Sequence, residues 1–219
     1  MGQTAIVIGA TGLIGKELVT QLLSDAGFST VKVFVRKKLE LQHQKLEQVI
    51  TDFDKISASS EKITGDVVFC AMGTTIRVAG SQEAFVKVDH TYVLNFAEAA
   101  KKNGVTRFVL VSSLGVSESG GNFYLTVKRD IEHALKRLKF ASLIIVRPSM
   151  LLGQRAEFRL GESIGKFLMK ALGFLFIGKL KKYKAIEAAV VAKAMIALSK
   201  VNLEDVSVFE SDRLQVLGK

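Results

Sequence analysis

Short apolar runs alternate with stretches of helical periodicity over the first two thirds of the chain. The runs are rich in β-branched residues, as strands buried on both faces are. This pattern predicts strands at 5–8, 31–35, 48–51, 66–71, 107–113, 142–147 and, late in the chain, 206–209. It predicts helices at 16–24, 81–103, 122–139, 186–200 and 211–217. Strands and helices in alternation predict a parallel, doubly wound α/β sheet with helices on both faces.

The alternation loosens after Pro148, the only proline. A loop is expected at 151–153, an apolar, glycine-interrupted segment at 162–178 and a basic turn at 179–184. We therefore expect one domain over 1–219, with 1–148 as the core and 149–219 as a small extension on the substrate side. The apolar stretch 167–178 is shorter than the roughly 20 residues that a membrane span needs, and core, lid or dimer face would each explain it.

A glycine motif lies between the predicted strand at 5–8 and the helix at 16–24. Gly9, Gly12 and Gly15 follow the spacing GxxGxxG. A helix that begins at such a turn offers free N–H groups and a positive dipole end to a phosphate. We expect a tight turn at Gly9, close approach of a pyrophosphate at Gly12 and helix–strand packing at Gly15. A turn without a ligand is the alternative, and the flanking elements favour nucleotide binding.

The predicted strand 31–35 ends in basic residues. Arg36, Lys37 and Lys38 follow it, and the first acidic residue is Glu40. An acid at this place would hold the ribose 2′-hydroxyl of NAD, whereas a guanidinium suits the 2′-phosphate of NADP. The pattern predicts NADP, with NAD less favoured. A solvated charge cluster is the alternative interpretation.

Tyr124 and Lys128 are four residues apart on the predicted helix 122–139, so they share one side of it. A phenol is a weak acid, and a nearby ammonium favours its phenolate form. The pair can therefore serve as a general acid/base and its activator. A serine at a neighbouring strand end could orient a carbonyl, and both Ser112 and Ser113 qualify. A half-exposed helix face is the alternative.

The net charge of +10 comes from 31 Lys and Arg against 21 Asp and Glu. Apart from the runs at 36–38 and 179–184, these basic residues are scattered, and they lack interleaved aromatics. An anionic cofactor together with a solvated surface is therefore favoured over nucleic acid as the explanation of the charge. The single cysteine, Cys70, cannot form an internal disulfide and is expected in the core. With a strand predicted so early, no signal peptide is expected, which predicts a cytoplasmic protein. His43, His90 and His133 show no metal-ligand spacing, so no metal is expected.

In order along the chain, these motifs resemble a short-chain dehydrogenase/reductase of the atypical or extended kind. More narrowly, the chain is similar to the Tat-interacting-protein-like NAD(P)-binding oxidoreductases. The resemblance covers essentially the whole chain. The segments that carry it are Gly9–Gly15, Arg36–Lys37, Asp52–Phe53, Gly73–Thr75, Ser112–Ser113, Tyr124-xxx-Lys128, Arg147–Pro148 and Leu217–Lys219.

The resemblance implies a Rossmann fold and NADP(H). It implies Tyr124 as general acid/base, Lys128 as its activator and ribose anchor, and Ser113 as the group that orients the carbonyl. Asp89 stands where many extended members have an asparagine, which puts a four-residue proton relay in question. The residues implied for cofactor binding are Gly9, Thr11, Gly12, Leu13, Ile14, Arg36, Lys37, Asp52, Phe53, Met72, Gly73, Thr74, Tyr124, Lys128 and Pro148.

Two functions follow from these expectations. The favoured one is an NADP(H)-dependent oxidoreductase that acts on a carbonyl or alcohol of small molecules through Ser, Tyr and Lys. The alternative is an NADP(H)-sensing regulatory protein that controls a protein partner with little or no turnover. The substrate and the oligomeric state are not predicted, because the residues that shape the substrate pocket fall in the irregular C-terminal third.

Overall fold

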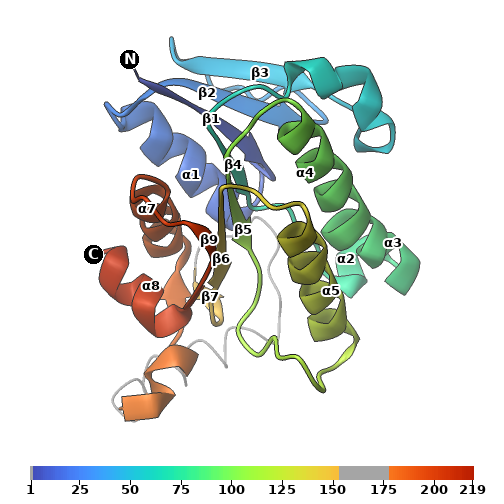
Figure 1. Cartoon of the computed structure of the whole chain (residues 1–219), viewed down its shortest axis with the longest axis vertical. Coiled ribbons are helices and arrows are strands. Elements are labelled where there is room, and N and C mark those ends of the chain that lie inside the picture. Colours follow the sequence, from blue (N-terminus) through green and yellow to red (C-terminus); the bar gives the residue numbers. More distant parts are fainter. Residues whose placement is uncertain (1, 153–177) are drawn as a thin grey trace.

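The computed structural model describes residues 2–152 and 178–219. Seven strands form one parallel sheet in the order β3-β2-β1-β4-β5-β6-β9 (Figure 1). The predicted α/β class is therefore confirmed. The strands are β1 Gln3–Ile8, β2 Phe28–Val35, β3 Leu46–Ile50, β4 Val67–Cys70, β5 Arg107–Val111, β6 Ser142–Arg147 and β9 Asp205–Glu210, with β7 Leu151–Leu152 and β8 Ile186–Glu187 in a separate pair.

Helices connect the strands. The α-helices are α1 Leu13–Ser24, α2 Ile76–Ala79, α3 Gln82–Val86, α4 Tyr92–Lys102, α5 Phe123–Arg137, α7 Ala188–Ser199 and α8 Ser211–Leu217. Two 3-10 segments, η1 Phe53–Lys62 and η4 Gly178–Tyr183, and one π-helical turn, η2 Lys87–Thr91, complete the described elements.

The sheet is covered on both faces. Helices α1, α7 and α8 lie on one side of it, and α4 and α5 on the other (Figure 1). Strand residues alternate between the two cores: Ala5 and Val7 pack with the α1 and α7 side, whereas Ile6 and Ile8 pack with the α4 and α5 side. Continuous apolar strands are therefore needed, which explains the runs seen in the sequence.

The strand order reverses beside β1, which pairs with β2 on one edge and with β4 on the other. In open parallel sheets a crevice forms at such a switch point, outside the carboxyl ends of the strands. Here the crevice lies where Ile8 of β1 and Cys70 of β4 end their strands. The glycine loop follows directly from Ile8, so it opens on this crevice.

The C-terminal part of the chain joins the same sheet. Strand β9 pairs in parallel with β6 over Asp205–Glu210, and α7 packs against α1. Strand β6 has the predicted bounds, and Asn122 caps α5 by accepting the Leu125 N–H at 3.0 Å. The predicted apolar segment up to residue 177 lies outside the described residues.

Two local predictions are wrong. Residues 151–152, expected to open a loop, form β7, which pairs Leu151 with Ile186 of β8. The helix expected from residue 186 therefore begins at Ala188.

The predicted helix 81–103 is one stack whose hydrogen bonding changes at η2, where the Tyr92 N–H bonds to Lys87 O, five residues back. Apolar periodicity does not reveal such a wide turn.

Candidate functional site

The loop between β1 and α1 is packed around two of its glycines. Gly9 has a φ of +81°, and a Cβ there would lie 2.5 Å from the Ala71 carbonyl carbon. A Cβ on Gly15 would overlap the carbonyl oxygen of Gly9. The tight turn and the helix packing are therefore as expected from the sequence. Gly12 is the N-cap of α1, and its approach to a pyrophosphate stays a prediction.

The amino end of α1 suits an anion. It has no side-chain cap and no acidic residue in its first turn. Thr11, Gly12, Leu13, Ile14 and Lys16 line the cavity beside it. The positive end of the helix dipole and a lysine therefore face the same space.

A first cavity of about 1000 Å³, the β2 cavity, lies at the end of β2. Arg36 and Lys37, which are exposed, line it together with Asp52 and Phe53. Phe53 is only 5% exposed, and its ring centroid lies 5.8 Å from that of Tyr92. Core packing therefore holds the ring in place on this side of the cavity.

A second cavity of about 550 Å³, the α5 cavity, lies at the ends of β5 and β6. Ser113, Tyr124, Lys128 and Pro148 line it together. The Tyr124 ring lies 5.7 Å from that of Phe85, so the phenol is packed in place from α3.

The two cavities form one cleft across the switch point. Both are lined by the glycine loop and by the segment that follows β4, through the shared residues Thr11, Gly12, Ala71, Met72, Gly73, Thr74 and Val78. Every residue that the sequence predicted for catalysis or cofactor binding lines one cavity or the other. Their individual roles stay predictions.

Lys128 is paired inside this cleft. Its Nζ lies 2.8 Å from Asp89 Oδ1, and Asp89 Oδ2 accepts the Thr74 N–H at 2.8 Å. Burial, the largest single effect, favours the neutral amine. The charge of Asp89, the interaction with Tyr124 and the hydrogen bond to Asp89 together outweigh burial, so the pKa of Lys128 lies above its ordinary value. Asp89 thus links the catalytic candidate on α5 to the loop after β4. Lys128 is only 5% exposed, so it does not lie on a half-exposed helix face.

The two candidate serines differ in their partners. Ser112 Oγ donates to Glu132 Oε1 at 2.5 Å, and Ser112 is 4% exposed. Ser113 is half-buried, and its Oγ donates to the Leu114 carbonyl oxygen at 3.2 Å. The Ser113 hydroxyl is therefore the more available of the two for a ligand in the α5 cavity.

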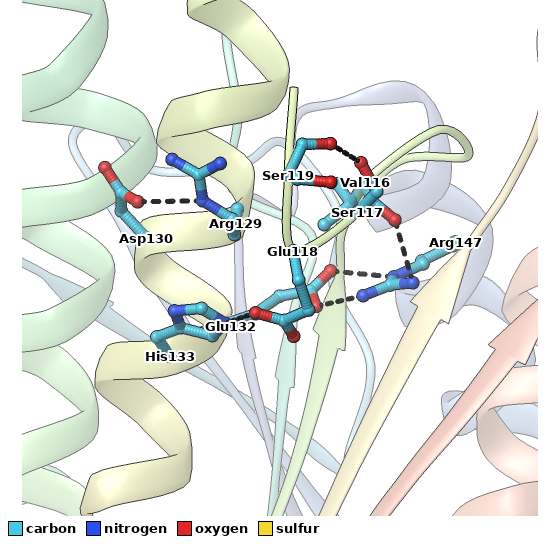
Figure 2. Close-up of polar contacts among 9 residues, drawn as sticks. All are labelled: Val116, Ser117, Glu118, Ser119, Arg129, Asp130, Glu132, His133 and Arg147. Carbon is cyan, nitrogen blue, oxygen red and sulfur yellow. Dashed lines mark hydrogen bonds and ion pairs between the residues drawn. The ribbon is translucent and has the colours of Figure 1, made fainter. Parts of the chain in front are cut away.

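One charged cluster beside the cleft was missed from the sequence. Glu132 is buried on α5 and pairs with Arg147 at the end of β6 (Figure 2). The sequence contains an indication of it, because Tyr124, Lys128 and Glu132 follow one another at intervals of four residues and therefore lie on one side of the helix. A glutamate in a helix is usually solvated, and its partner on β6 could not be read from helical spacing.

The cysteine and the three histidines do not line either cavity. Cys70 is fully buried, as expected, and burial raises the pKa of its thiol to about 12. Within residues 2–152 and 178–219, no group of His, Cys, Asp and Glu could hold a metal ion. His133 contacts Glu118 instead, with 3.0 Å between Nε2 and Oε2.

The glycine loop, the switch-point cleft and the fold agree with the comparison with known families. A family model described as NAD(P)H-binding matches residues 9–166. The chain belongs to the NAD(P)H-binding family. Its ligand is therefore a nicotinamide cofactor, although the match does not distinguish NADP from NAD.

Several named proteins are similar to much of the chain. Protein HTATIP2 of Rattus norvegicus is 38% identical over 168 residues, which cover 75% of this chain and 69% of that protein. The mitochondrial protein fmp52 of Emericella nidulans is 32% identical over 197 residues, or 87% and 84% of the two chains. The solved structure of MoeE5 in complex with UDP-glucuronic acid and NAD has a TM-score of 0.73 at 18% identity and covers 95% of this chain and 76% of its own. That likeness shows the fold.

The names of these relatives correct one expectation. The cytoplasmic location predicted from the sequence is contradicted, because fmp52 and its counterparts in other fungi are named mitochondrial. A single cysteine fits any reducing compartment, so it could not distinguish among them. Among the described residues, no helix is long and apolar enough to cross a bilayer.

Proposed function

We propose that the protein is an NADP(H)-dependent oxidoreductase of the short-chain dehydrogenase/reductase type. It passes a hydride to or from a carbonyl or alcohol of a small-molecule substrate. The observation that carries the proposal is the placement of Tyr124 and Lys128, one turn apart on α5, in the same cleft as the amino end of α1. The similarity to the Tat-interacting-protein-like oxidoreductases supports the same subgroup.

The cleft fits a dinucleotide. Gly9 packs against Ala71 and Gly15 packs against Gly9, which shapes the turn so that Gly12, at the start of α1, can approach a pyrophosphate. The exposed Arg36 and Lys37 fit a 2′-phosphate beside the adenosine. The remaining proposed contacts fall into three groups. The pyrophosphate would contact Thr11, Gly12, Leu13 and Ile14, and the adenine would contact Asp52 and Phe53. The nicotinamide would contact Met72, Gly73, Thr74 and Pro148.

When bound, the nicotinamide ring supplies or accepts the hydride. Tyr124 gives its phenolic proton to the carbonyl oxygen during reduction and takes it back during oxidation. The ammonium of Lys128 stabilises the phenolate that remains and anchors the ribose. Ser113 donates a hydrogen bond that orients the carbonyl. Segment 149–219 contributes the substrate side of this single domain.

The variant Tyr124→Phe tests this proposal. NADPH oxidation is measured against a panel of aldehydes and ketones, with Tyr183→Phe as the control because Tyr183 is exposed and does not line the cleft. We expect kcat to fall about 10²- to 10⁴-fold in Tyr124→Phe, the usual value of general acid catalysis, with the dissociation constant of NADPH nearly unchanged. Equal turnover in both variants would contradict the assignment.

A cofactor-sensing regulatory protein is the second candidate. The observation that favours it is the Asp89–Lys128 pair, which occupies the ammonium that catalysis would use. This second function predicts tight NADPH binding, no turnover by the wild type, and a partner protein whose affinity for this protein changes when NADPH is bound. Turnover that Tyr124→Phe abolishes would exclude it.

A further inference from the structure

Glu132 and Arg147 form a bidentate ion pair between α5 and the end of β6 (Figure 2). Arg147 Nε donates to Glu132 Oε1 at 3.0 Å, and Nη2 donates to Oε2 at 2.6 Å. Glu132 is 1% exposed, and hydrogen bonding to its carboxylate raises the pKa of Arg147 above the ordinary value. Two parallel bonds of this kind fix orientation as well as distance.

The pair also holds two segments that lead to the site. Ser112 Oγ donates to Glu132 Oε1 at 2.5 Å, and Arg147 Nη1 donates to the Val116 carbonyl oxygen at 3.1 Å. The end of β5, the loop after it and the end of β6 are therefore all attached to α5. Figure 2 shows the loop running beside the helix at this point.

Each anchored segment carries a candidate for the reaction. Ser112 precedes Ser113, and Arg147 precedes Pro148. Two backbone bonds connect the same segments, from Ser112 N to Val146 O at 2.8 Å and from Leu114 N to Pro148 O at 3.0 Å. Glu132 and Arg147 do not line either cavity, so they act on the site only through these neighbours.

Stability is a weak reason for such a pair. Removing two charges from water is costly, and apolar residues of similar size often replace a buried ion pair without loss of stability. The gain that remains is a fixed geometry. We infer that Glu132 and Arg147 are positioning residues that hold Ser113 and Pro148 opposite Tyr124 and Lys128. This inference rests on the proposed function.

A second contact of the loop is weaker. Glu118, which is exposed, pairs with His133 of α5 at 3.0 Å, and Ser117 Oγ donates to Ser119 O at 2.6 Å (Figure 2). Exposed ion pairs contribute little, since water screens them. The buried pair should therefore dominate the placement of the loop.

The test is the double variant Glu132→Met/Arg147→Leu, which removes both charges together and leaves neither unpaired. Arg147→Lys keeps the charge without the fork. Asp25→Asn/Lys200→Met is the control, because this ion pair of 2.5 Å joins α7 to the end of α1 away from the cleft. Thermal unfolding verifies the fold of each, and amide hydrogen exchange of residues 113–119, the dissociation constant of NADPH, KM and kcat are measured.

We expect residues 113–119 to exchange faster in the double variant and kcat to fall about 100-fold, the effect of a misplacement of about 1 Å. The dissociation constant of NADPH and KM should stay within about threefold of the wild-type values. The exchange rate and kcat of Arg147→Lys should lie between those of the wild type and the double variant, and the control variant should match the wild type. Wild-type exchange in the double variant, or faster exchange with unchanged kcat, would overturn the inference. If the wild type does not oxidise NADPH, the proposed function is refuted instead. In that case, wild-type hydrogen exchange of residues 113–119 in the double variant would still show that Glu132 and Arg147 do not anchor the loop.

Discussion

Asp89 Oδ1 lies 2.8 Å from Lys128 Nζ, and both side chains are buried. The carboxylate keeps a charged lysine in a place where burial favours the neutral amine. Asp89→Asn retains the shape and an acceptor for the Thr74 N–H but removes the charge. It should lower the pKa of Lys128 and destabilise the fold by about 3 kcal/mol at neutral pH, as breaking a buried pair does.

The sign of the pH effect follows from the raised pKa of Lys128. In the wild type, the pair stabilises the fold at neutral pH, and this contribution is lost as pH rises above the ordinary lysine value of 10.5. In Asp89→Asn, the ammonium is lost at lower pH, so the alkaline limb of kcat/KM should move toward neutral pH. Asp130→Asn is the control, because Asp130 is exposed on α5 and pairs only loosely with Arg129 at 3.4 Å. An alkaline limb that stays in place in Asp89→Asn would contradict the role of Asp89.

Gly9→Ala should destabilise the protein and remove nucleotide binding. The substitution meets both a positive φ of +81° and a Cβ position 2.5 Å from backbone. Gly104→Ala separates the two effects, because Gly104 has a φ of +82° and nothing within 4 Å of the added carbon. We expect Gly104→Ala to cost about 1 kcal/mol of unfolding free energy and Gly9→Ala clearly more, as measured by urea denaturation. Similar losses in the two variants would show that the close approach to Ala71 is unimportant.

Arg36→Glu should weaken NADPH binding far more than NADH binding. A guanidinium–phosphate contact typically contributes about 1.5–3 kcal/mol, which corresponds to roughly 10- to 150-fold in the ratio of the two dissociation constants. Lys38→Glu changes the net charge equally but does not line the β2 cavity. Titration calorimetry with both cofactors gives the ratio, and a ratio equal in the two variants would remove the role given to Arg36.

Cys70 should not react with iodoacetamide in the native protein at pH 8. Its pKa of about 12 leaves on the order of one thiolate in 10⁴ molecules, and the side chain is fully buried. Labelling followed by mass spectrometry should show reaction only after unfolding in urea. Rapid native labelling would show that β4 opens locally.

Much of the fold could be predicted because its strands are buried on both faces. Strand β6 contains only apolar residues between Ser142 and Arg147, and this apolar run predicts both of its bounds. Strand β8 is not predicted from the sequence, because Ile186 and Glu187 form a strand only by pairing with β7 and directly precede a helix of high apolar content. Two residues are too few for a periodic signal.

The cleft was predictable where spacing carries the chemistry. Tyr124 and Lys128 share a helix side by their separation of four, and the roles of Gly9 and Gly15 follow from steric needs of a strand–turn–helix connection. Partners from distant elements were beyond such an argument. Asp89 is 39 positions from Lys128, and Glu132 finds Arg147 across a helix–strand interface, so neither pair has a local signature.

The π-helical turn at Lys87–Thr91 sets the rotational phase of one helix stack. An α-helix advances 100° per residue, so one extra residue in a turn rotates everything before it relative to everything after it. Asp89 lies within this wide turn and faces Lys128, whereas Phe96 and Ala97, farther along, lie in the core against the sheet. Deleting one residue from Lys87–Thr91 would keep the stack helical but would rotate the residues before the deletion relative to those after it.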